Sequence, residues 1–146
     1  MAREYCRGLT RQQLMDMGIY RIDWDKDSQQ WWIDRYWYPN YRNKTKRHIR
    51  VKIHIVTAEH KYGKTKRYPK IQINYLGKGY AFPLSRVVYC WFINDIPDGY
   101  VIDHIDNDPF NNRLNNLQML TIEENNRKRF EDLGVTCINQ WYNTTK

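Results

Sequence analysis

The stretch that most constrains the fold is "VIDHIDNDPFNNRLNNLQMLTIEENN", residues 101–126. The segments "YVIDHI" and "NLQMLT" each predict a short strand, and the polar "DNDPFNNRLN" between them predicts a long turn. Thr121, followed three residues later by Glu124, is a capping-box pattern, so a helix should begin there and end near Gly134. The predicted order is therefore strand, turn, strand, helix.

This stretch also holds seven asparagines, three aspartates and one histidine. Asparagine is a poor former of helix and strand because its amide competes for the local backbone. A solvated loop is one interpretation; the other is that some of these amides hold a histidine and a metal ion. In a hairpin followed by a helix, Asp103 and His104 end the first strand and Asn116 begins the second. Asn125 then falls in the first turn of the helix. Strand neighbours point to opposite faces, so the strand must end or twist for Asp103 and His104 to share a site.

Each of these four side chains suits a role in cutting a phosphodiester bond. Histidine titrates near neutrality, so His104 can act as the general base that activates water. The amide oxygen of Asn116 can accept a hydrogen bond from the second ring nitrogen and fix the tautomer. Asp103 and Asn125 offer oxygen ligands, which favour one Mg²⁺ or Mn²⁺ ion over zinc. Such a cation stabilises negative charge that develops on the phosphate.

"DHIDNDPFNNRLNNLQMLTIEENN" resembles the core of HNH endonucleases with the ββα-metal fold, and in particular the phage-type HNH homing endonucleases. The upstream "FPLSRVVYCWFINDIPDGY" is similar to the helix and turn that lead into that core, and the resemblance covers about residues 71 to 130. It implies that Asp103 binds metal, His104 is the general base and Asn116 orients it. Asn125 stands where many members carry a final histidine, a departure that a subgroup shares, and Asn126 is its alternative in register.

The resemblance further implies hydrolysis of double-stranded DNA to 5′-phosphate and 3′-hydroxyl ends. It implies a free-standing phage homing endonuclease that acts in the cytoplasm of a bacterial host, as a monomer or a homodimer. Two alternatives stay open from the sequence. One is a non-catalytic nucleic-acid-binding module on the same scaffold, and the other is a nonspecific HNH nuclease.

Charge is distributed unevenly along the chain. The net charge is +8, but residues 35–70 hold twelve basic residues and one acidic residue, a net +11, whereas residues 101–146 carry −2. Such a basic region favours contact with a polyanion such as the DNA backbone. The residues that we expect to contact DNA phosphates are Arg47, Arg50, Lys52, Lys64, Lys66, Arg67 and, beside the site, Arg113.

The N-terminal region predicts a short helix followed by strands. "LTRQQLMDMG", residues 9–18, has Thr10 as the N-cap and Gly18 as the stop. "WWIDRYWY", "IRVKIHIV" and "YPKIQINYLGKGYAF" predict an antiparallel sheet with a basic outer face and a turn at "LGKGY". In "HIRVKIHIV" alternation predicts a single strand, with one face made of Ile49, Val51, Ile53 and Ile55 and the other of Arg50, Lys52 and His54.

The expected fold class is α+β. Residues 1–82 form a basic β-rich DNA-binding region, 83–133 a helix (83–95) and the ββα-metal core, and 134–146 a tail. The three cysteines are odd in number and far apart, which predicts no disulfide framework and a reduced, cytosolic protein. No apolar run approaches the roughly 20 residues that span a bilayer, so we expect no membrane association. The loop residues Asn107, Asn111 and Asn112 are expected to shape turns.

Overall fold

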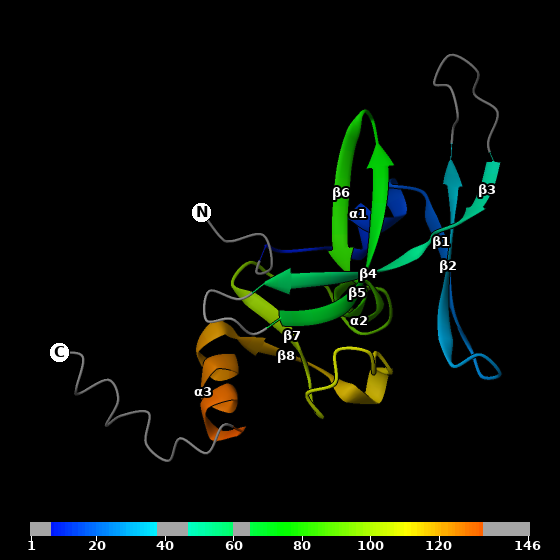
Figure 1. Cartoon of the computed structure of the whole chain (residues 1–146). Coiled ribbons are helices and arrows are strands. Elements are labelled where there is room, and N and C mark those ends of the chain that lie inside the picture. Colours follow the sequence, from blue (N-terminus) through cyan, green and yellow to red (C-terminus); the bar gives the residue numbers. More distant parts are fainter. Residues whose placement is uncertain (1–6, 38–46, 60–64, 133–146) are drawn as a thin grey trace.

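The computed structural model describes residues 7–37, 47–59 and 65–132. The fold is α+β and rich in antiparallel strands, which confirms the predicted class (Figure 1). In chain order the elements are α1 (Arg11–Asp16), β1 (Ile19–Asp25), β2 (Gln30–Trp37), β3 (Arg47–Arg50), β4 (Ile53–Glu59), β5 (Thr65–Tyr75), β6 (Lys78–Pro83), α2 (Leu84–Phe92), β7 (Tyr100–His104), the 3₁₀ helix η2 (Leu114–Asn116), β8 (Leu117–Thr121) and α3 (Ile122–Asp132).

Helix α1 begins where its cap predicts. The Thr10 hydroxyl accepts a hydrogen bond from the Gln13 N–H at 3.1 Å, and the Gln13 side chain accepts one from the Thr10 N–H at 2.9 Å. The helix is followed by Gly18 with a φ of 99°, a left-handed conformation that glycine adopts without strain. A Cβ at this position would lie 2.5 Å from the carbonyl oxygen of Tyr36. The prediction of a short helix within residues 9–18 is confirmed.

The β-rich region forms two sheets, in the orders β1–β2–β3 and β4–β5–β6. The prediction of one strand through "HIRVKIHIV" is therefore wrong, because the chain leaves the first sheet after Arg50 and enters the second at Ile53. Buried Val51 marks the crossing, and its N–H donates to the Ile33 carbonyl at 2.8 Å. Ile55, predicted on the apolar face, is 56% exposed. Alternation could not reveal the crossing because both strands keep the same period.

The hairpin predicted at "LGKGY" joins β5 to β6. Tyr75 pairs with Lys78, which leaves Leu76 and Gly77 as a two-residue turn. Both turn residues have positive φ, 51° and 75°, as in the hairpin turns whose twist matches that of the flanking strands. This prediction is confirmed.

One hydrophobic core joins the β-rich region to the C-terminal elements. The N–H and carbonyl of Leu9 exchange hydrogen bonds of 2.8 Å with those of Ile96, just beyond α2. Helix α2, predicted within residues 83–95, lies in the middle of this core with its side chains from Leu84 to Cys90 buried. The division of the chain at residues 82 and 83 stays a prediction, but the core is common to both parts. Its buried members come from both sides of that division: Leu9, Leu14, Met17, Ile19, Ile22, Trp31, Ile33, Val51, Ile71, Ile73, Leu84, Val87, Val88, Tyr89, Cys90, Ile96 and Leu117.

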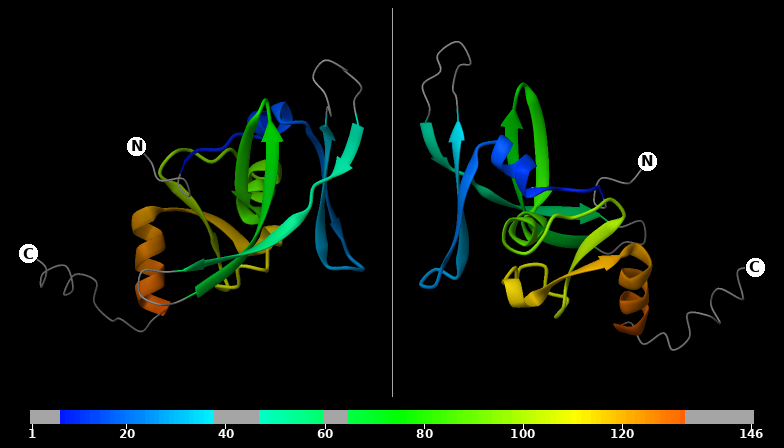
Figure 2. Two further views of the ribbon diagram at one scale, coloured as in Figure 1. Left: turned by 45° about the horizontal axis from the view of Figure 1, so that its top comes forward. Right: turned by 180° about the vertical axis from the view of Figure 1, so that it is seen from behind.

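Strands β7 and β8 pair antiparallel, and α3 packs against both, which gives the predicted strand–turn–strand–helix unit. The Thr121 hydroxyl accepts from the Glu124 N–H at 3.1 Å, and Glu124 accepts from the Thr121 N–H at 3.2 Å, so the capping box is formed. Gly134 and the predicted tail lie outside the described residues. Helix α3 and the β1–β2–β3 sheet lie at opposite ends of the molecule (Figure 2). None of the described helices could cross a bilayer.

Candidate active site

His104 is half-buried at the end of β7, and its ring is held by Asn112. The ring Nε2 lies 2.7 Å from Oδ1 of Asn112, while the Asn112 amide group donates to the Pro109 carbonyl at 3.2 Å. The amide is thereby oriented with its oxygen toward the ring, where it can accept a hydrogen bond from an Nε2–H group. Buried Trp31 fixes the same residue from β2, because its indole N–H donates to the Asn112 carbonyl at 2.9 Å.

Asn116, predicted to orient His104, has other partners. It is buried at the end of η2, and its carbonyl accepts from the Ile105 N–H at 2.9 Å, so its place near the end of β7 is as expected. Its side chain accepts from the Asp106 N–H at 3.1 Å, and donates to Asp106 Oδ1 at 2.9 Å and to the Asn111 carbonyl at 2.8 Å. Asn116 therefore fastens the loop of residues 105–116, and the contact with the ring belongs to Asn112 instead.

The Asx turns of this loop are formed by aspartates, whereas asparagines were expected to form them. Asp106 accepts from the Asp108 N–H at 2.8 Å, and Asp108 accepts from the Phe110 N–H at 3.0 Å, which are both Asx turns. The Asn111 amide donates to Asp106 at 2.8 Å. This bond, with those from the Asp108 N–H and Asn116, lowers the pKa of Asp106 to about 2.

Asp103 faces α3 and is paired there with a lysine. Its Oδ2 accepts from the Gln118 side chain at 2.8 Å and lies 3.2 Å from the ammonium of Lys128. That ammonium also donates to the His104 carbonyl at 3.2 Å and to Oδ1 of Asn107 at 2.6 Å. The side chains of Asp103 and His104 thus have different partners, as alternation along a strand requires: α3 for the carboxylate and the 105–116 loop for the ring.

Asn125 lies in the first turn of α3, three residues before Lys128, so both project from the same side of the helix. It is half-buried, whereas its register alternative Asn126 is exposed. In the described part of the chain no group of three or more His, Cys, Asp and Glu side chains could hold a metal. The predicted ligands, Asp103 and Asn125, do not form such a group, because they are only two and one of them is an amide. Both offer oxygen atoms, which Mg²⁺ and Mn²⁺ prefer.

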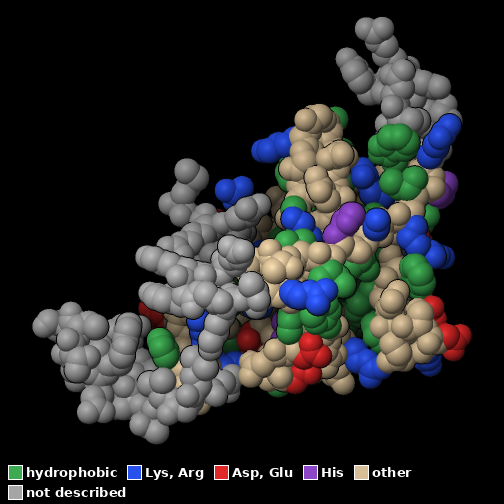
Figure 3. All heavy atoms as spheres, viewed as in Figure 1, with side chains coloured by type: hydrophobic (Ala, Val, Ile, Leu, Met, Phe, Trp, Pro, Cys, Tyr) green, Lys and Arg blue, Asp and Glu red, His purple; other side chains and the backbone are tan. Residues whose placement is uncertain are grey.

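The predicted DNA-contacting residues that are described in the β-rich region lie on two different sheets and on the segment between them. Arg47 and Arg50 are exposed on β3, and Lys52 is exposed between the two sheets. Lys66 and Arg67 are exposed on β5 of the other sheet, and Lys64 lies outside the described residues. Figure 3 accordingly shows basic side chains on several parts of the face in view. Their contact with DNA stays a prediction.

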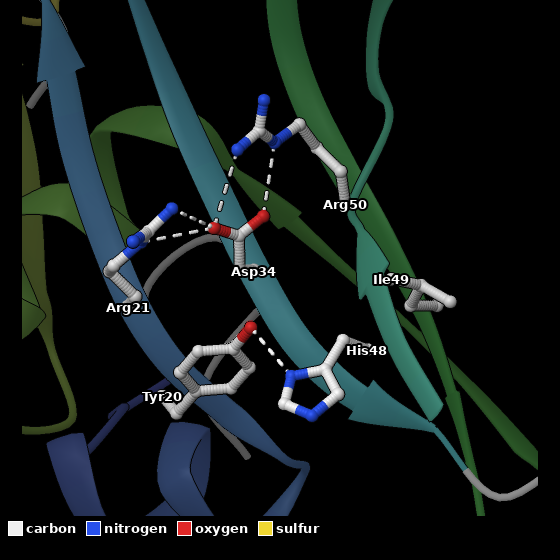
Figure 4. Close-up of a pocket in the computed structure, with 6 residues that line it drawn as sticks. All are labelled: Tyr20, Arg21, Asp34, His48, Ile49 and Arg50. Atoms are coloured by element: carbon white, nitrogen blue, oxygen red, sulfur yellow. Dashed lines mark hydrogen bonds and ion pairs between the residues drawn. The ribbon is translucent and has the colours of Figure 1, made fainter. Parts of the chain in front are cut away.

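Arg50 takes part in a cluster on the outer face of the first sheet (Figure 4). Buried Asp34 on β2 lies between Arg21 on β1 and Arg50 on β3, with N–O distances of 2.9 and 3.0 Å. The hydrogen bond from Arg50 is the main reason that the pKa of Asp34 is lowered. Beside this cluster a shallow pocket of about 340 Å³ is lined by Tyr20, Arg21, Asp34, His48, Ile49 and Arg50.

Arg113 connects the loop to the β1–β2 hairpin. Its guanidinium lies 5.2 Å from the ring centroid of Trp24 and donates a hydrogen bond to the Gln29 side chain. Its predicted phosphate contact is untested. The sequence did not predict these two partners of Arg113. It also did not predict the contacts of Trp31, Asn112, Gln118 and Lys128 at the site. A usable signal existed for Lys128 alone, since it follows Asn125 by three positions on the predicted helix.

Comparison with known proteins matches residues 84–127 to a family model described as HNH endonuclease. A 42-residue segment is 45% identical to the "SPbeta prophage-derived putative HNH homing endonuclease YosQ" of Bacillus subtilis (strain 168). That segment covers 29% of this chain and 24% of the relative, so the likeness is confined to about a quarter of that protein. No solved structure gives a significant match. The matched segment includes α2, β7, the 105–116 loop, β8 and the first part of α3.

Proposed function

We propose that the protein is a metal-dependent endonuclease that hydrolyses phosphodiester bonds of double-stranded DNA, because residues 84–127 match a family model described as HNH endonuclease. The observation that carries the proposal is the half-buried imidazole of His104, held through Nε2 by Asn112 at the end of a ββα hairpin. The strand neighbour, Asp103, supplies a carboxylate directed at α3. In this proposal His104 is the general base, and Asn116 acts indirectly by holding the loop around it.

In this proposal His104 takes a proton from the attacking water through Nδ1. The bond from Nε2 to Asn112 keeps the ring in the tautomer that leaves Nδ1 unprotonated. The buried backbone of Asn112, fixed by Trp31, prevents the ring from turning away. Proton transfer by a positioned side chain contributes about 10²- to 10⁴-fold to a rate.

Asp103 and Asn125 would hold one Mg²⁺ or Mn²⁺ ion. The carboxylate of Asp103 fits this role because it already faces a cationic group, the Lys128 ammonium, at 3.2 Å. Asn125 lies on the side of α3 that carries Lys128, and the two ligands are oxygens, which hard divalent cations prefer. The bound cation would stabilise the negative charge of the phosphate and the leaving 3′-oxygen.

The proposed partner is duplex DNA in the cytoplasm of a bacterial host, and the proposed biological role is that of a phage homing endonuclease. The net charge of +11 over residues 35–70 supports DNA binding, and the prophage-derived relative supports the role. A chain with one such site makes nicking by a monomer the simplest activity; cutting both strands requires a dimer or two sequential events.

The test is the His104→Ala variant on supercoiled plasmid with Mg²⁺ or Mn²⁺. We expect nicking to fall at least about 100-fold because the base is removed, while a gel shift in the absence of metal shows unchanged DNA binding. His54→Ala is the matched control, since His54 is exposed on β4, far along the chain from the loop. Nicking retained by His104→Ala would refute the proposal. A wild-type protein that shifts plasmid DNA and never relaxes it would instead be a binding module.

A further inference from the structure

The ammonium of Lys128 is enclosed by three oxygen atoms near the end of β7. They are Oδ2 of Asp103 at 3.2 Å, the main-chain oxygen of His104 at 3.2 Å and Oδ1 of Asn107 at 2.6 Å. We call these three atoms the oxygen cradle. The side chains of Lys128 and Asp103 are 21% and 13% exposed, so this ion pair is largely withdrawn from water.

The turn after β7 provides two of the three oxygen atoms of the cradle, those of His104 and Asn107. The Asn107 N–H donates to the His104 carbonyl at 2.9 Å and closes a turn over residues 104–107. Asn107 has a φ of 64°, a left-handed conformation that asparagine tolerates better than other non-glycine residues. The turn thus places the Asn107 side-chain oxygen and the His104 carbonyl on the same ammonium.

The chemistry of the oxygen cradle is that of a hard-cation site. A carboxylate, a main-chain carbonyl and a side-chain amide are the ligand types that Mg²⁺, Mn²⁺ and Ca²⁺ take in proteins. A lysine ammonium is a compact positive charge with three rotatable N–H donors, so it can bond to oxygen atoms in many arrangements. Lys128 therefore supplies, within the fold, the positive charge that these oxygens require.

We propose that Lys128 is the built-in counter-ion of the active site, which occupies the oxygen cradle in the metal-free protein and is displaced when the divalent cation binds. The inference rests on the proposed function, because it concerns the cation that Asp103 and Asn125 would hold. It adds two features. Lys128 competes with the metal ion for the oxygen cradle, and the Asn107 side chain and the His104 carbonyl belong to the cation site.

Two physical arguments support competition between Lys128 and the metal. Asp103 Oδ2 cannot keep the ammonium at 3.2 Å and also contact a divalent cation without strong repulsion between the two positive charges. Without Lys128, a largely buried carboxylate would stand without a compensating charge, which is costly in the absence of metal. The lysine therefore compensates the charge of Asp103 in the absence of metal, at the expense of weaker metal affinity.

The experiment measures Mn²⁺ binding to the full-length protein without DNA, by isothermal titration calorimetry. Lys128→Gln removes the ammonium, and Arg129→Gln is the matched control, since it removes an equal charge from the neighbouring exposed position of α3. We expect Lys128→Gln to bind Mn²⁺ at least about tenfold more tightly than wild type, because a unit charge in contact with the site is removed. Arg129→Gln should change the affinity less than about threefold because of screening by solvent and salt.

A second measurement uses the wild-type protein and so does not depend on the folding of a variant. In a Mg²⁺ titration followed by NMR, the side-chain signals of Lys128 should move to those of a solvated lysine, while those of exposed Lys26 stay unchanged. Equal Mn²⁺ affinities for Lys128→Gln and Arg129→Gln, no Mn²⁺ binding by Lys128→Gln, or unmoved Lys128 signals at saturating Mg²⁺ would each overturn the inference. None of these results bears on His104, whose plasmid assay decides the proposed function separately.

Discussion

The bond between His104 and Asn112 gives a prediction that separates the two candidate orienting residues. Asn112→Ala removes the acceptor 2.7 Å from Nε2, and with it the contact that selects the tautomer. For histidines in metal sites, loss of the partner that orients the ring typically costs about 10- to 100-fold in affinity or activity, and we take the same scale for His104. We therefore expect single-turnover nicking to slow by about that factor in Asn112→Ala, with DNA affinity unchanged.

Asn116→Ala should affect stability more than chemistry. The Asn116 side chain makes three hydrogen bonds and that of Asn112 makes two. At about 1 kcal/mol of net stability for each, the expected losses in the free energy of unfolding are about 3 and 2 kcal/mol. For a chain of this size each kcal/mol lowers Tm by about 2–4 °C, so Asn116→Ala should melt roughly 6–12 °C below wild type and Asn112→Ala roughly 4–8 °C.

The assay is single-turnover relaxation of supercoiled plasmid at 20 °C, with the folded fraction of each variant checked by circular dichroism. Asn115→Ala is the matched control, because Asn115 is an exposed asparagine of the same loop. A ¹⁵N spectrum of His104 should show the Nε2-protonated form in wild type and Asn116→Ala, and a mixture in Asn112→Ala. Wild-type nicking by folded Asn112→Ala, together with slow nicking by folded Asn116→Ala, would refute the assignment and restore the one made from the sequence.

Two further predictions concern the loop around the site. Trp31→Phe removes the buried indole N–H that bonds to the Asn112 carbonyl, so the free energy of unfolding in urea should fall by about 1–3 kcal/mol; an unchanged midpoint would contradict this. Because the pKa of Asp106 is lowered to about 2 from 3.8, its stabilising contribution is complete above the ordinary value and is lost as the pH falls toward 2. The Tm of Asp106→Asn should therefore depend less on pH between 5 and 2 than that of wild type, and equal slopes would argue against it.

Local signals predicted the elements that frame the site. The two capping boxes, at Thr10 and at Thr121, each satisfy backbone N–H groups at the start of a helix. The two residues of each box are three positions apart, so their effect does not depend on the rest of the fold. The two-residue turn at Leu76 and Gly77 is equally local. These features are decided by neighbours in the chain, and the sequence is sufficient to find them.

The crossing between the sheets at Val51 was beyond such signals. Residues on both sides of it alternate with the same period, and only the pairing of Val51 with Ile33 shows where the first sheet ends. The partners of Asp103 and His104 were hidden for a related reason. Alternation along the strand correctly predicted that the two side chains point apart. It could not predict that α3 provides a partner for Asp103 and that the loop provides one for His104.

The dependence of the site on distant strands also limits what the ββα segment can do alone. The ring of His104 is oriented by Asn112, and Asn112 is fixed by Trp31, which lies 81 positions earlier in the chain on β2. Arg113, the next residue of the loop, is held by Gln29, which lies two positions before Trp31 in the turn of the same hairpin. Since both contacts come from the β-rich region, that region sets the geometry of the proposed base as well as carrying most of the positive charge. A substitution in β2 that leaves every residue of the matched segment 84–127 intact can therefore misplace the imidazole.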